Sequence, residues 1–306
     1  MKHVVYTFKN FLKEHFPFPV RKLQIHTNLG CPHRNNKTGD EGGCIYCYNP
    51  GFSNIKNSTA DVTRQFQEGI QNSRNRGFQG KYLAYFQTYT NTYAEINVLK
   101  SWWHKIYDYP DDIVGLAIGT RPDCLEPDVL DELSNIAKTH MVWLELGLQS
   151  AHDRTLQLIK RGHDYDCFVD AVKRIQKYPN MLICAHIILG LPGENVDDMQ
   201  HTIAEINKLH LDGVKMHHLQ VVKKTDLAQW YQSGKVNVFT EQEYIDVLKT
   251  LLPHLSPDIV VHRLVGEIQD NLLIAPRWNI LKPKLIQMLY HQMQTEGLYQ
   301  GKHFSD

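Results

Sequence analysis

Three cysteines, Cys31, Cys44 and Cys47, lie in the stretch CPHRNNKTGDEGGCIYC. Cysteine thiolates bind zinc and iron–sulfur clusters, and three thiolates are one fewer than the four that close a tetrahedral site. Three thiolates can bind three irons of a four-iron cluster and leave the fourth iron open to another ligand. The spacing therefore predicts a reactive metal centre.

A structural zinc site is the alternative for the same loop. His33 could supply a nitrogen as the fourth ligand. Zinc sites of this kind usually combine two closely spaced ligand pairs, whereas this loop contains one CxxC pair, Cys44 and Cys47. The loop therefore favours an iron–sulfur cluster, and Tyr46 would place an aromatic ring beside it.

Alternating strand and helix patterns must position this loop. Apolar runs typical of buried strands begin at Leu23, Lys81, Asp112, Met141, Asn180 and Gly213. Between them, apolar residues recur at helical spacing, as after Pro127, a residue that suits the first position of a helix. We therefore expect an α/β fold, a partial (β/α)6 TIM-like barrel with N- and C-terminal additions, whose chemistry gathers at the C-terminal strand ends.

Three segments are expected along the chain. Residues 1–22 are predicted to form an N-terminal helical extension, and residues 23–225 the barrel core. Residues 226–306 are predicted to form a C-terminal extension packed on the barrel. That extension includes a strand-like run from Asp258 and a closing helix around 283–293.

Composition narrows the class of protein. The 306 residues include 33 basic and 33 acidic side chains, so net charge predicts neither a nucleic-acid nor a membrane partner. No apolar run is long enough to span a membrane, and the N-terminus does not read as a secretory signal. With six cysteines, three of them in one loop, we expect a cytoplasmic protein with reduced thiols.

Further segments follow the cysteine loop in a specific order, namely YFQTYTNTYA, TRPDCL, ELGLQSAHDRTL, RGHD, CAHIILGLPGE, GVKMHHLQVVKKT and VVHRLVGE. In this order they resemble the radical S-adenosylmethionine (radical SAM) superfamily. The common spacing there is CxxxCxxC, whereas twelve residues separate Cys31 from Cys44 here. The longer spacing resembles the branch related to the catalytic subunit of elongator, and within it the YhcC/YtqA-type family.

The resemblance implies a [4Fe-4S] cluster held by Cys31, Cys44 and Cys47, with S-adenosyl-L-methionine (SAM) on the open iron. An electron from the cluster would cleave SAM to a 5′-deoxyadenosyl radical, which abstracts a hydrogen from the substrate. A reducing electron donor such as flavodoxin or ferredoxin is then required. The protein would contribute positioning and exclusion of side reactions.

The resemblance also implies a set of cofactor-binding residues. It comprises Tyr46, Gln87, Thr90, Asn91, Glu145, Gln149, Gly190, Gly193, Glu194 and Lys215. Several of these residues have a structural alternative. The segment 87–91 could be a polar turn, and Glu145 could form an internal bridge to Arg121 or Lys215. The segment 190–194 could be a strand-to-helix turn with Glu194 in the first helical turn.

Substrate contacts are expected from Arg121 and Asp123 after the third strand and from His217 in the sixth. Strand alternation sends one of His217 and His218 inward, and Lys215 shares the face of His217. His262 and Arg263 could extend the pocket. Cys167 and Cys184 are expected to pack as small apolar residues, whereas Cys124 could have a redox role.

The branch resemblance suggests modification of the wobble uridine of tRNA, from a carboxymethylaminomethyl to an aminomethyl side chain. The basic residues that could attract the phosphates are Lys2, Lys9, Lys13 and Arg21 near the start and Lys223 and Lys224 after the sixth strand. Two alternatives stay open at this point: a radical enzyme acting on a small metabolite, and a zinc-binding adaptor that is not an enzyme.

Overall fold

The computed structural model describes residues 3–27, 29–34, 42–48 and 61–305. Its centre is a parallel sheet of seven strands in the order β1-β2-β3-β4-β5-β6-β8. The strands are β1 (Val20–Ile25), β2 (Lys81–Phe86), β3 (Ile113–Thr120), β4 (Met141–Gln149), β5 (Met181–Leu189), β6 (Gly213–His218) and β8 (Val260–Arg263). A separate antiparallel pair joins β7 (Val221–Val222) to β9 (Leu273–Ala275).

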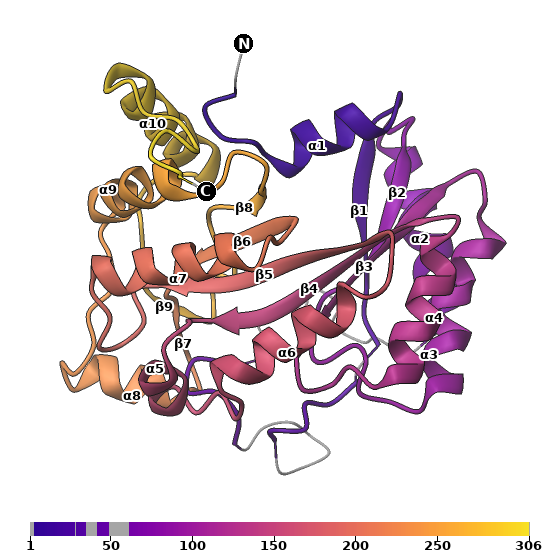
Figure 1. Ribbon diagram of the computed structural model, residues 1–306, viewed down its shortest axis with the longest axis horizontal. Helices are drawn as coiled ribbons and strands as arrows, with labels where there is room; N and C mark the ends of the chain where they lie inside the picture. The colour runs from indigo at the N-terminus through magenta and orange to yellow at the C-terminus, as the bar shows by residue number, and fades with distance from the viewer. Residues whose placement is uncertain (1–2, 28, 35–41, 49–60, 306) are drawn as a thin grey trace.

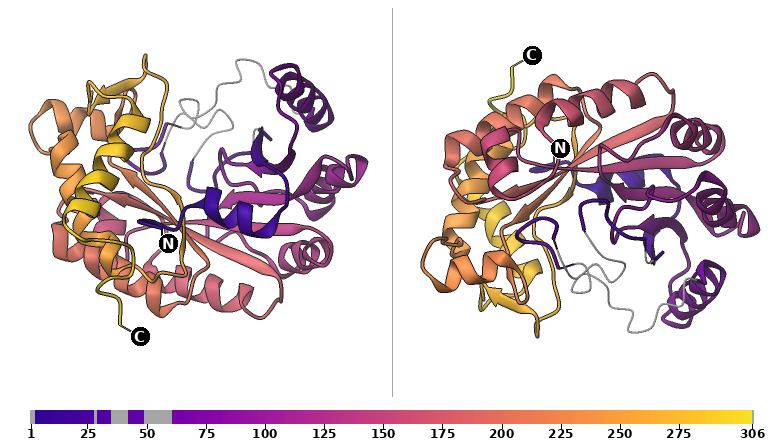
Figure 2. Two further views of the ribbon diagram at one scale, coloured as in Figure 1. Left: turned by 90° about the horizontal axis from the view of Figure 1, so that it is seen from above. Right: turned by 90° about the horizontal axis from the view of Figure 1, so that it is seen from below.

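The sheet curls into a half-barrel with helices on its outer face (Figure 1). The longer helices are α1 (Phe8–His15), α2 (Val62–Asn75), α3 (Ile96–Trp103), α4 (Pro127–Ala137), α6 (Tyr165–Ile175), α7 (Val196–Lys208), α9 (Glu241–Leu251) and α10 (Lys282–Thr295). The shorter ones are α5 (Asp153–Leu158), α8 (Asp226–Gln232), η2 (His104–Asp108) and η3 (Leu252–His254). Seen from above in Figure 2, α1 lies across the N-terminal edge of the sheet.

Strand alternation separates two cores. On β2, Ala84 and Phe86 point outward into the large core beneath the helices. Leu83 and Tyr85 point inward and join a smaller core with Trp143 and helix α1. The strands are buried on both faces, which explains why their sequences read as nearly continuous apolar runs.

Close packing between β3 and β4 requires glycine at one point. A Cβ atom added to Gly115 would lie 2.0 Å from the carbonyl oxygen of Met141, a distance at which atoms overlap. Only glycine therefore lets these two strands approach in their observed register, which pairs Gly115 with Met141.

The six predicted strands are present, and the α/β half-barrel is confirmed. The predicted run from Gly213 is divided between β6 and β7, and the run from Asp258 supplies a seventh strand, β8, which pairs with β6. The predicted boundary at residue 22 falls inside β1, and the boundary at residue 225 falls at the N-cap of α8. No helix in the described ranges combines the length and apolar character needed to cross a membrane.

Candidate active site

Cys31, Cys44 and Cys47 border one cavity inside the half-barrel, with a volume of about 170 Å³. This cavity is called the cysteine cavity below. The amide of Arg34 donates to the carbonyl of Cys31 and the amide of Cys47 donates to that of Cys44, both at 3.0 Å. Two tight turns therefore present the thiols at the C-terminal edge of the sheet.

Ile45 anchors the loop. Its side chain is buried, its amide donates to the carbonyl of Ile159 at 3.0 Å, and its carbonyl accepts from the amide of Leu227 at 2.9 Å. The segment between Cys44 and Cys47 is therefore attached to the end of α5 and the start of α8, so the thiols have a fixed support.

The arrangement of the three cysteine thiols suits a four-iron cluster better than a single metal ion. In the described ranges, no three His, Cys, Asp or Glu side chains gather closely enough to hold a single metal ion. A four-iron cluster instead engages each thiolate through a separate iron, so its ligands surround a space. The three thiols around the cysteine cavity fit that requirement, and Cys31, Cys44 and Cys47 are the residues that would hold the cluster.

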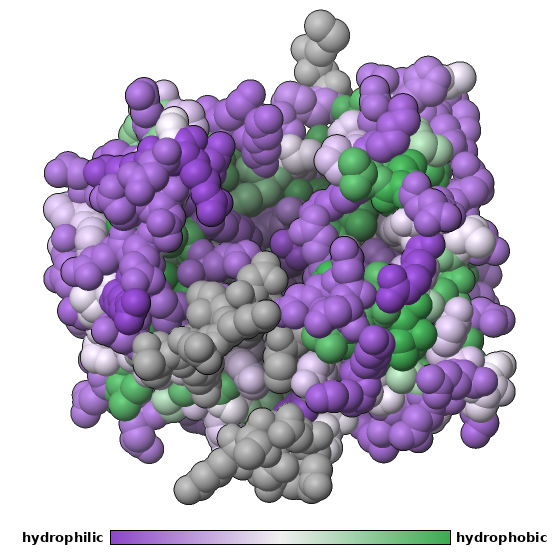
Figure 3. Space-filling model, turned by 180° about the vertical axis from the view of Figure 1, so that it is seen from behind, coloured by the Kyte–Doolittle hydropathy of each residue, from purple (hydrophilic) through white to green (hydrophobic). Residues whose placement is uncertain are grey.

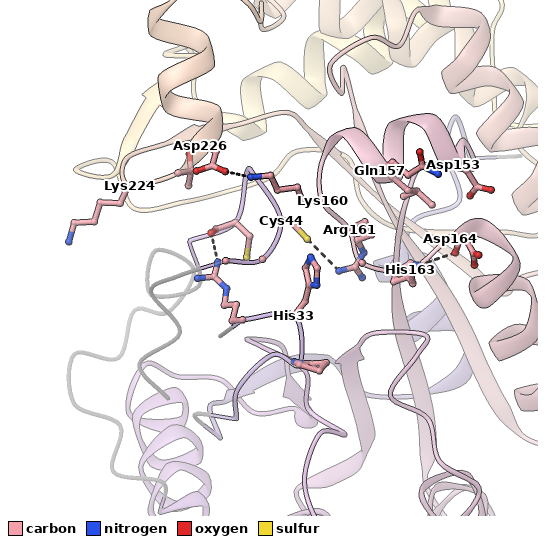
Figure 4. A pocket seen from close by; sticks show the side chains of 18 residues that line it. His33, Cys44, Asp153, Gln157, Lys160, Arg161, His163, Asp164, Lys224 and Asp226 are labelled. Atoms are coloured by element: carbon pink, nitrogen blue, oxygen red, sulfur yellow. Dashed lines mark hydrogen bonds and ion pairs between the residues drawn. The ribbon is translucent and has the colours of Figure 1, made fainter. Parts of the chain in front are cut away.

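Three arginines border the cysteine cavity with the thiols, namely Arg34, Arg121 and Arg161. Nη1 of Arg161 lies 3.8 Å from Sγ of Cys44 (Figure 4). Its Nη2 donates to the carbonyl of Gly147 at 2.7 Å. Arg34 donates to the carbonyl of Cys47. Burial and the neighbouring Cys44 raise the pKa of Cys47 to about 11, and Arg34 opposes that rise. Arginine charge at these positions stabilises thiolates and an anionic group bound to them.

Arg121 and Asp123 form a bidentate ion pair beside the same cavity. Nε and Nη2 of Arg121 donate to the two carboxylate oxygens at 2.8 and 2.7 Å, and Nη1 donates to the carbonyl of Arg161 at 3.0 Å. Burial disfavours the Asp123 carboxylate, but the Arg121 bonds outweigh burial and lower its pKa. Only Arg121 of this pair borders the cysteine cavity.

The turn after β2 contributes in two ways. Gln87 and Thr90 border the cysteine cavity. Asn91 has a structural task, because its Nδ2 donates at 2.9 Å to the carbonyls of Thr88 and Gly119 and its Oδ1 accepts from Thr27. The polar-turn alternative therefore describes Asn91, whereas cofactor contact stays a prediction for Gln87 and Thr90.

Glu145 is fully buried at the floor of the barrel interior. Its Oε2 accepts from Tyr85 at 2.7 Å, His186 at 2.8 Å and Lys215 at 2.9 Å. Its Oε1 accepts from Lys22 and from His262, the latter at 3.2 Å. The internal bridge to Lys215 is thus present, and the one to Arg121 is replaced by the Arg121–Asp123 pair.

Charge in this network is strongly constrained. Burial disfavours the Glu145 carboxylate, but Lys215 and Lys22 outweigh burial and hold its pKa well below the usual value. Burial lowers the pKa of His186 to about 4 and that of His262 to about 3, so both imidazoles are neutral near pH 7. Burial also lowers the pKa of Lys215 to about 8, and Glu145 opposes that fall.

Gln149, Tyr46 and His217 come together at a small cavity of about 150 Å³ next to the cysteine cavity. Gln149 has a φ of 75° beside an irregularity in the β4–β5 pairing, which turns the chain at the strand end. Gln149 and Tyr46 border both cavities. These predicted residues are therefore grouped beside the thiols.

The predicted contribution of segment 190–194 takes a different form. Gly190 and Gly193 have positive φ values of 84° and 82°, and Ser150 donates to the carboxylate of Glu194. Glu194 precedes Asn195, the N-cap of α7, so its predicted place in the first helical turn is wrong. None of these residues borders the cavities described here. The segment forms the strand-to-helix turn, and cofactor contact stays a prediction for Gly190, Gly193 and Glu194.

A larger cavity of about 430 Å³, called the lateral cavity, opens beside β8. Its lining includes Tyr85, Gln87, His186, Lys215, His217 and Arg263. Gln87 and His186 also border the cysteine cavity, so the two spaces share a wall. Figure 3 shows the face behind the view of Figure 1, which is largely hydrophilic and hollowed near its centre.

His217 and His218 point to opposite sides, as strand alternation predicts. His217 lines the lateral cavity with Lys215, whereas His218 packs against Trp278, with ring centroids 4.2 Å apart, and against Tyr244. Cys184 is fully buried in the interior core. Burial raises the pKa of Cys124 to about 12, so this thiol stays protonated near pH 7.

A third space, the outer cavity of about 680 Å³, lies on the other side of the cysteine loop (Figure 4). Cys44 and Cys47 border it together with Lys160, Arg161 and His33. His33 packs against Gly162, where an added Cβ would lie 2.5 Å from the ring nitrogen Nδ1. The glycine at this positive-φ turn therefore makes room for His33.

Sequence reasoning assigned no role to Arg34, Arg161, Lys22, Tyr85 or His186. His186 shares the inward face of β5 with Cys184, and β5 follows β4 in the sheet. Alternation along these two strands was the available signal for a contact between His186 and Glu145.

Comparison with known proteins identifies the family. A model of the radical SAM superfamily matches residues 27–206, and a model of the radical SAM C-terminal domain matches residues 211–295. The chain belongs to the radical SAM superfamily. It is therefore a radical SAM enzyme, and the zinc-adaptor alternative is set aside. Members of the superfamily use a [4Fe-4S] cluster and SAM and need an electron donor; when bound, the cluster supplies the electron for reductive cleavage of SAM.

The relatives refine this placement. Protein YtqA of Bacillus subtilis (strain 168) is 35% identical over 98% of this chain and 92% of its own length, which confirms the YhcC/YtqA-type resemblance. A tRNA uridine(34) acetyltransferase of Methanocaldococcus infernus is 24% identical over 60% of this chain and 34% of its own length. Archaeal Elp3 of the same organism has the same fold, with a TM-score of 0.67 and 21% identity over 78% of this chain and 60% of that structure.

Proposed function

We propose that the enzyme modifies the wobble uridine of tRNA, converting a carboxymethylaminomethyl side chain to an aminomethyl side chain. The lateral cavity carries the proposal. Its volume of about 430 Å³ lies within the range of about 300–1,000 Å³ typical of small-molecule sites. That space can admit one nucleobase with its side chain and shares a wall with the cysteine cavity.

The match to tRNA uridine(34) acetyltransferases supports the choice of tRNA, because it covers more than half of this chain. The chain covers only 34% of that relative, so acetyl transfer is not part of the proposal. Of the basic residues considered for phosphate contact, Lys224 borders the outer cavity at the active edge. Lys9 and Lys13 belong to α1 at the opposite edge, where they cannot guide a substrate to the cavities.

Roles follow for the residues around the cavities. Cys31, Cys44 and Cys47 hold the cluster, and Gln87, Thr90, Gln149 and Tyr46 line the space next to it for SAM. Arg121 fixes the loop that carries Arg161, and His217 faces the substrate from the lateral cavity. The cytoplasm is the proposed compartment, with flavodoxin or ferredoxin as the electron donor.

The experiment compares tRNA nucleosides from a deletion strain and its parent by liquid chromatography and mass spectrometry. The deletion strain should accumulate the carboxymethylaminomethyl nucleoside and lose the aminomethyl nucleoside and its products. Plasmid-borne wild-type protein should restore the parental profile, and Cys44→Ala should not, because it lacks a cluster ligand. Cys167→Ala is the matched control, since Cys167 lies on α6 outside the cavities.

An unchanged nucleoside profile in the deletion strain would refute the tRNA substrate. A small-metabolite substrate would then be the better account. Formation of 5′-deoxyadenosine by the anaerobically reconstituted enzyme, without tRNA dependence, would support that outcome.

A further inference from the structure

The lateral cavity carries uncompensated positive charge. Two cations, Lys215 and Arg263, line the cavity. A third, Lys22, lies beside Lys215, and both lysines contact the buried carboxylate of Glu145. Glu267 borders the cavity, but its side chain is 61% exposed and its carboxylate pairs with Lys282 at 3.0 Å. Lys22 and Lys215 share the one buried carboxylate of Glu145, and Arg263 has no acidic partner in the described residues, so the three cations exceed the buried anion by two charges.

Neighbouring titratable groups do not cancel this charge. Burial lowers the pKa values of His186, His217 and His262, so their rings are neutral near pH 7. Burial and Glu145 raise the pKa of Tyr85 well above its usual value, so its hydroxyl also stays neutral. Burying net charge without a counter-charge is costly, which predicts that the cavity is completed by an anionic ligand.

Arg263 is the group best placed to bind that ligand. Its guanidinium forms no hydrogen bond or ion pair with the described part of the chain, although it is half-buried and lines the cavity. Strand pairing places it opposite Lys215. His217, whose Nε2 is buried without a partner in the described residues, lies on the same strand face as Lys215. The guanidinium geometry suits a carboxylate, which it can bind through two parallel hydrogen bonds.

We propose that Arg263, Lys215 and His217 form a carboxylate subsite that holds the acidic end of the substrate side chain in the lateral cavity. This inference rests on the proposed function, in which the substrate carries such a carboxylate. Gln87 and His186 border both cavities, so a molecule anchored at Arg263 extends toward the cysteine cavity. The subsite therefore selects the acidic side chain and orients it.

The test measures binding rather than turnover. Cluster-loaded protein with S-adenosylhomocysteine is titrated with 5-carboxymethylaminomethyluridine and with its neutral amide. Wild-type protein should bind the acid ~10- to 100-fold more tightly than the amide, the ratio expected for a charge-assisted contact. Arg263→Gln should lose this preference, and Arg263→Lys should keep part of it because it retains the charge.

Arg76→Gln is the matched control, because Arg76 is an exposed residue at the end of α2 and lies outside the cavities. It should bind both compounds as the wild type does. Equal denaturation midpoints for Arg263→Gln and Arg76→Gln would show that the fold is intact. Equal binding of acid and amide by the wild type, or an unchanged preference in Arg263→Gln, would overturn the subsite.

Failure of the tRNA proposal is a separate result, seen as an unchanged nucleoside profile in the deletion strain. Titration with N-ethylglycine and its amide then tests the carboxylate contact without uridine. The anion could alternatively be a tRNA phosphate. In that case Arg263→Gln would weaken tRNA binding equally for acidic and amidated wobble side chains, and the carboxylate assignment would be wrong.

Discussion

Glu145 is the residue on which the interior of the barrel depends most. Its carboxylate accepts hydrogen bonds from five other strands of the sheet. The donors are Lys22 on β1, Tyr85 on β2, His186 on β5, Lys215 on β6 and His262 on β8. One buried anion therefore ties together strands that are far apart in sequence.

Glu145→Gln should lower the free energy of unfolding by about 3 kcal/mol at pH 7, because Lys215 stays buried without its carboxylate. Glu68→Gln is the control; it removes an exposed pair with Arg64 on α2 and should cost less than about 0.5 kcal/mol. Denaturant titration measures both changes.

The cost of Glu145→Gln should also depend on pH. The folded-state pKa of Glu145 lies well below its ordinary value of 4.5. The carboxylate therefore contributes stability that is fully present above about pH 4.5 and is lost as the pH falls further. A variant as stable as Glu68→Gln at pH 7 would contradict this account of the network.

At the scale of elements, α1 closes one end of the half-barrel. Phe8 packs against His262 with the rings tilted and their centroids 4.2 Å apart, and it meets Trp143 edge to face at 5.8 Å. Phe11 meets the same indole at 5.3 Å. The helix therefore covers the floor on which the Glu145 network rests.

Phe8→Ala should cost about 3–5 kcal/mol of stability, the range for removing a large aromatic side chain from a core. Phe16→Ala is the matched control, because Phe16 is only half-buried at the C-cap of α1. Its cost should be clearly smaller in the same denaturant titration. Equal costs for the two variants would show that α1 does not seal the barrel.

The strand and helix pattern was predictable because fully buried parallel strands produce apolar runs, as in MVWLELGLQ. The place of Glu194 was not, since the N-cap at Asn195 depends on local backbone geometry. The bridge from Glu145 to Lys215 was among the sequence expectations, but the contacts of Glu145 with Lys22 and His262 were out of reach. Lys22 and His262 lie 123 and 117 residues from it, and only the curled sheet brings them together.

At the scale of the whole molecule, the C-terminal segment is part of the barrel. β8 pairs with β6, and the amide of its residue Val261 donates to the carbonyl of Tyr6 at 2.8 Å. Gln300 accepts from the amide of Tyr6 at 2.8 Å and donates to the carbonyls of Ser256 and Ile259 at 2.7 Å. The two ends of the chain are therefore held together.

A fragment of residues 1–225 should fail to fold, because it leaves the edge of β6 and its apolar surface uncovered. Size-exclusion chromatography should show aggregation, and thermal unfolding should lack a cooperative transition. A chain of residues 1–302 is the control, since it keeps Gln300 and its contacts. A monomeric, cooperatively unfolding 1–225 fragment would show that the core is independent of the C-terminal segment.

The cysteine loop separates two spaces, because Cys44 and Cys47 border both the cysteine cavity and the outer cavity. A cluster held by these cysteines would therefore be approachable from the outer cavity as well as from the cysteine cavity. A donor protein docked at the outer cavity would leave the cysteine cavity free. Electron delivery and the exchange of substrate and product would then use different faces of the loop.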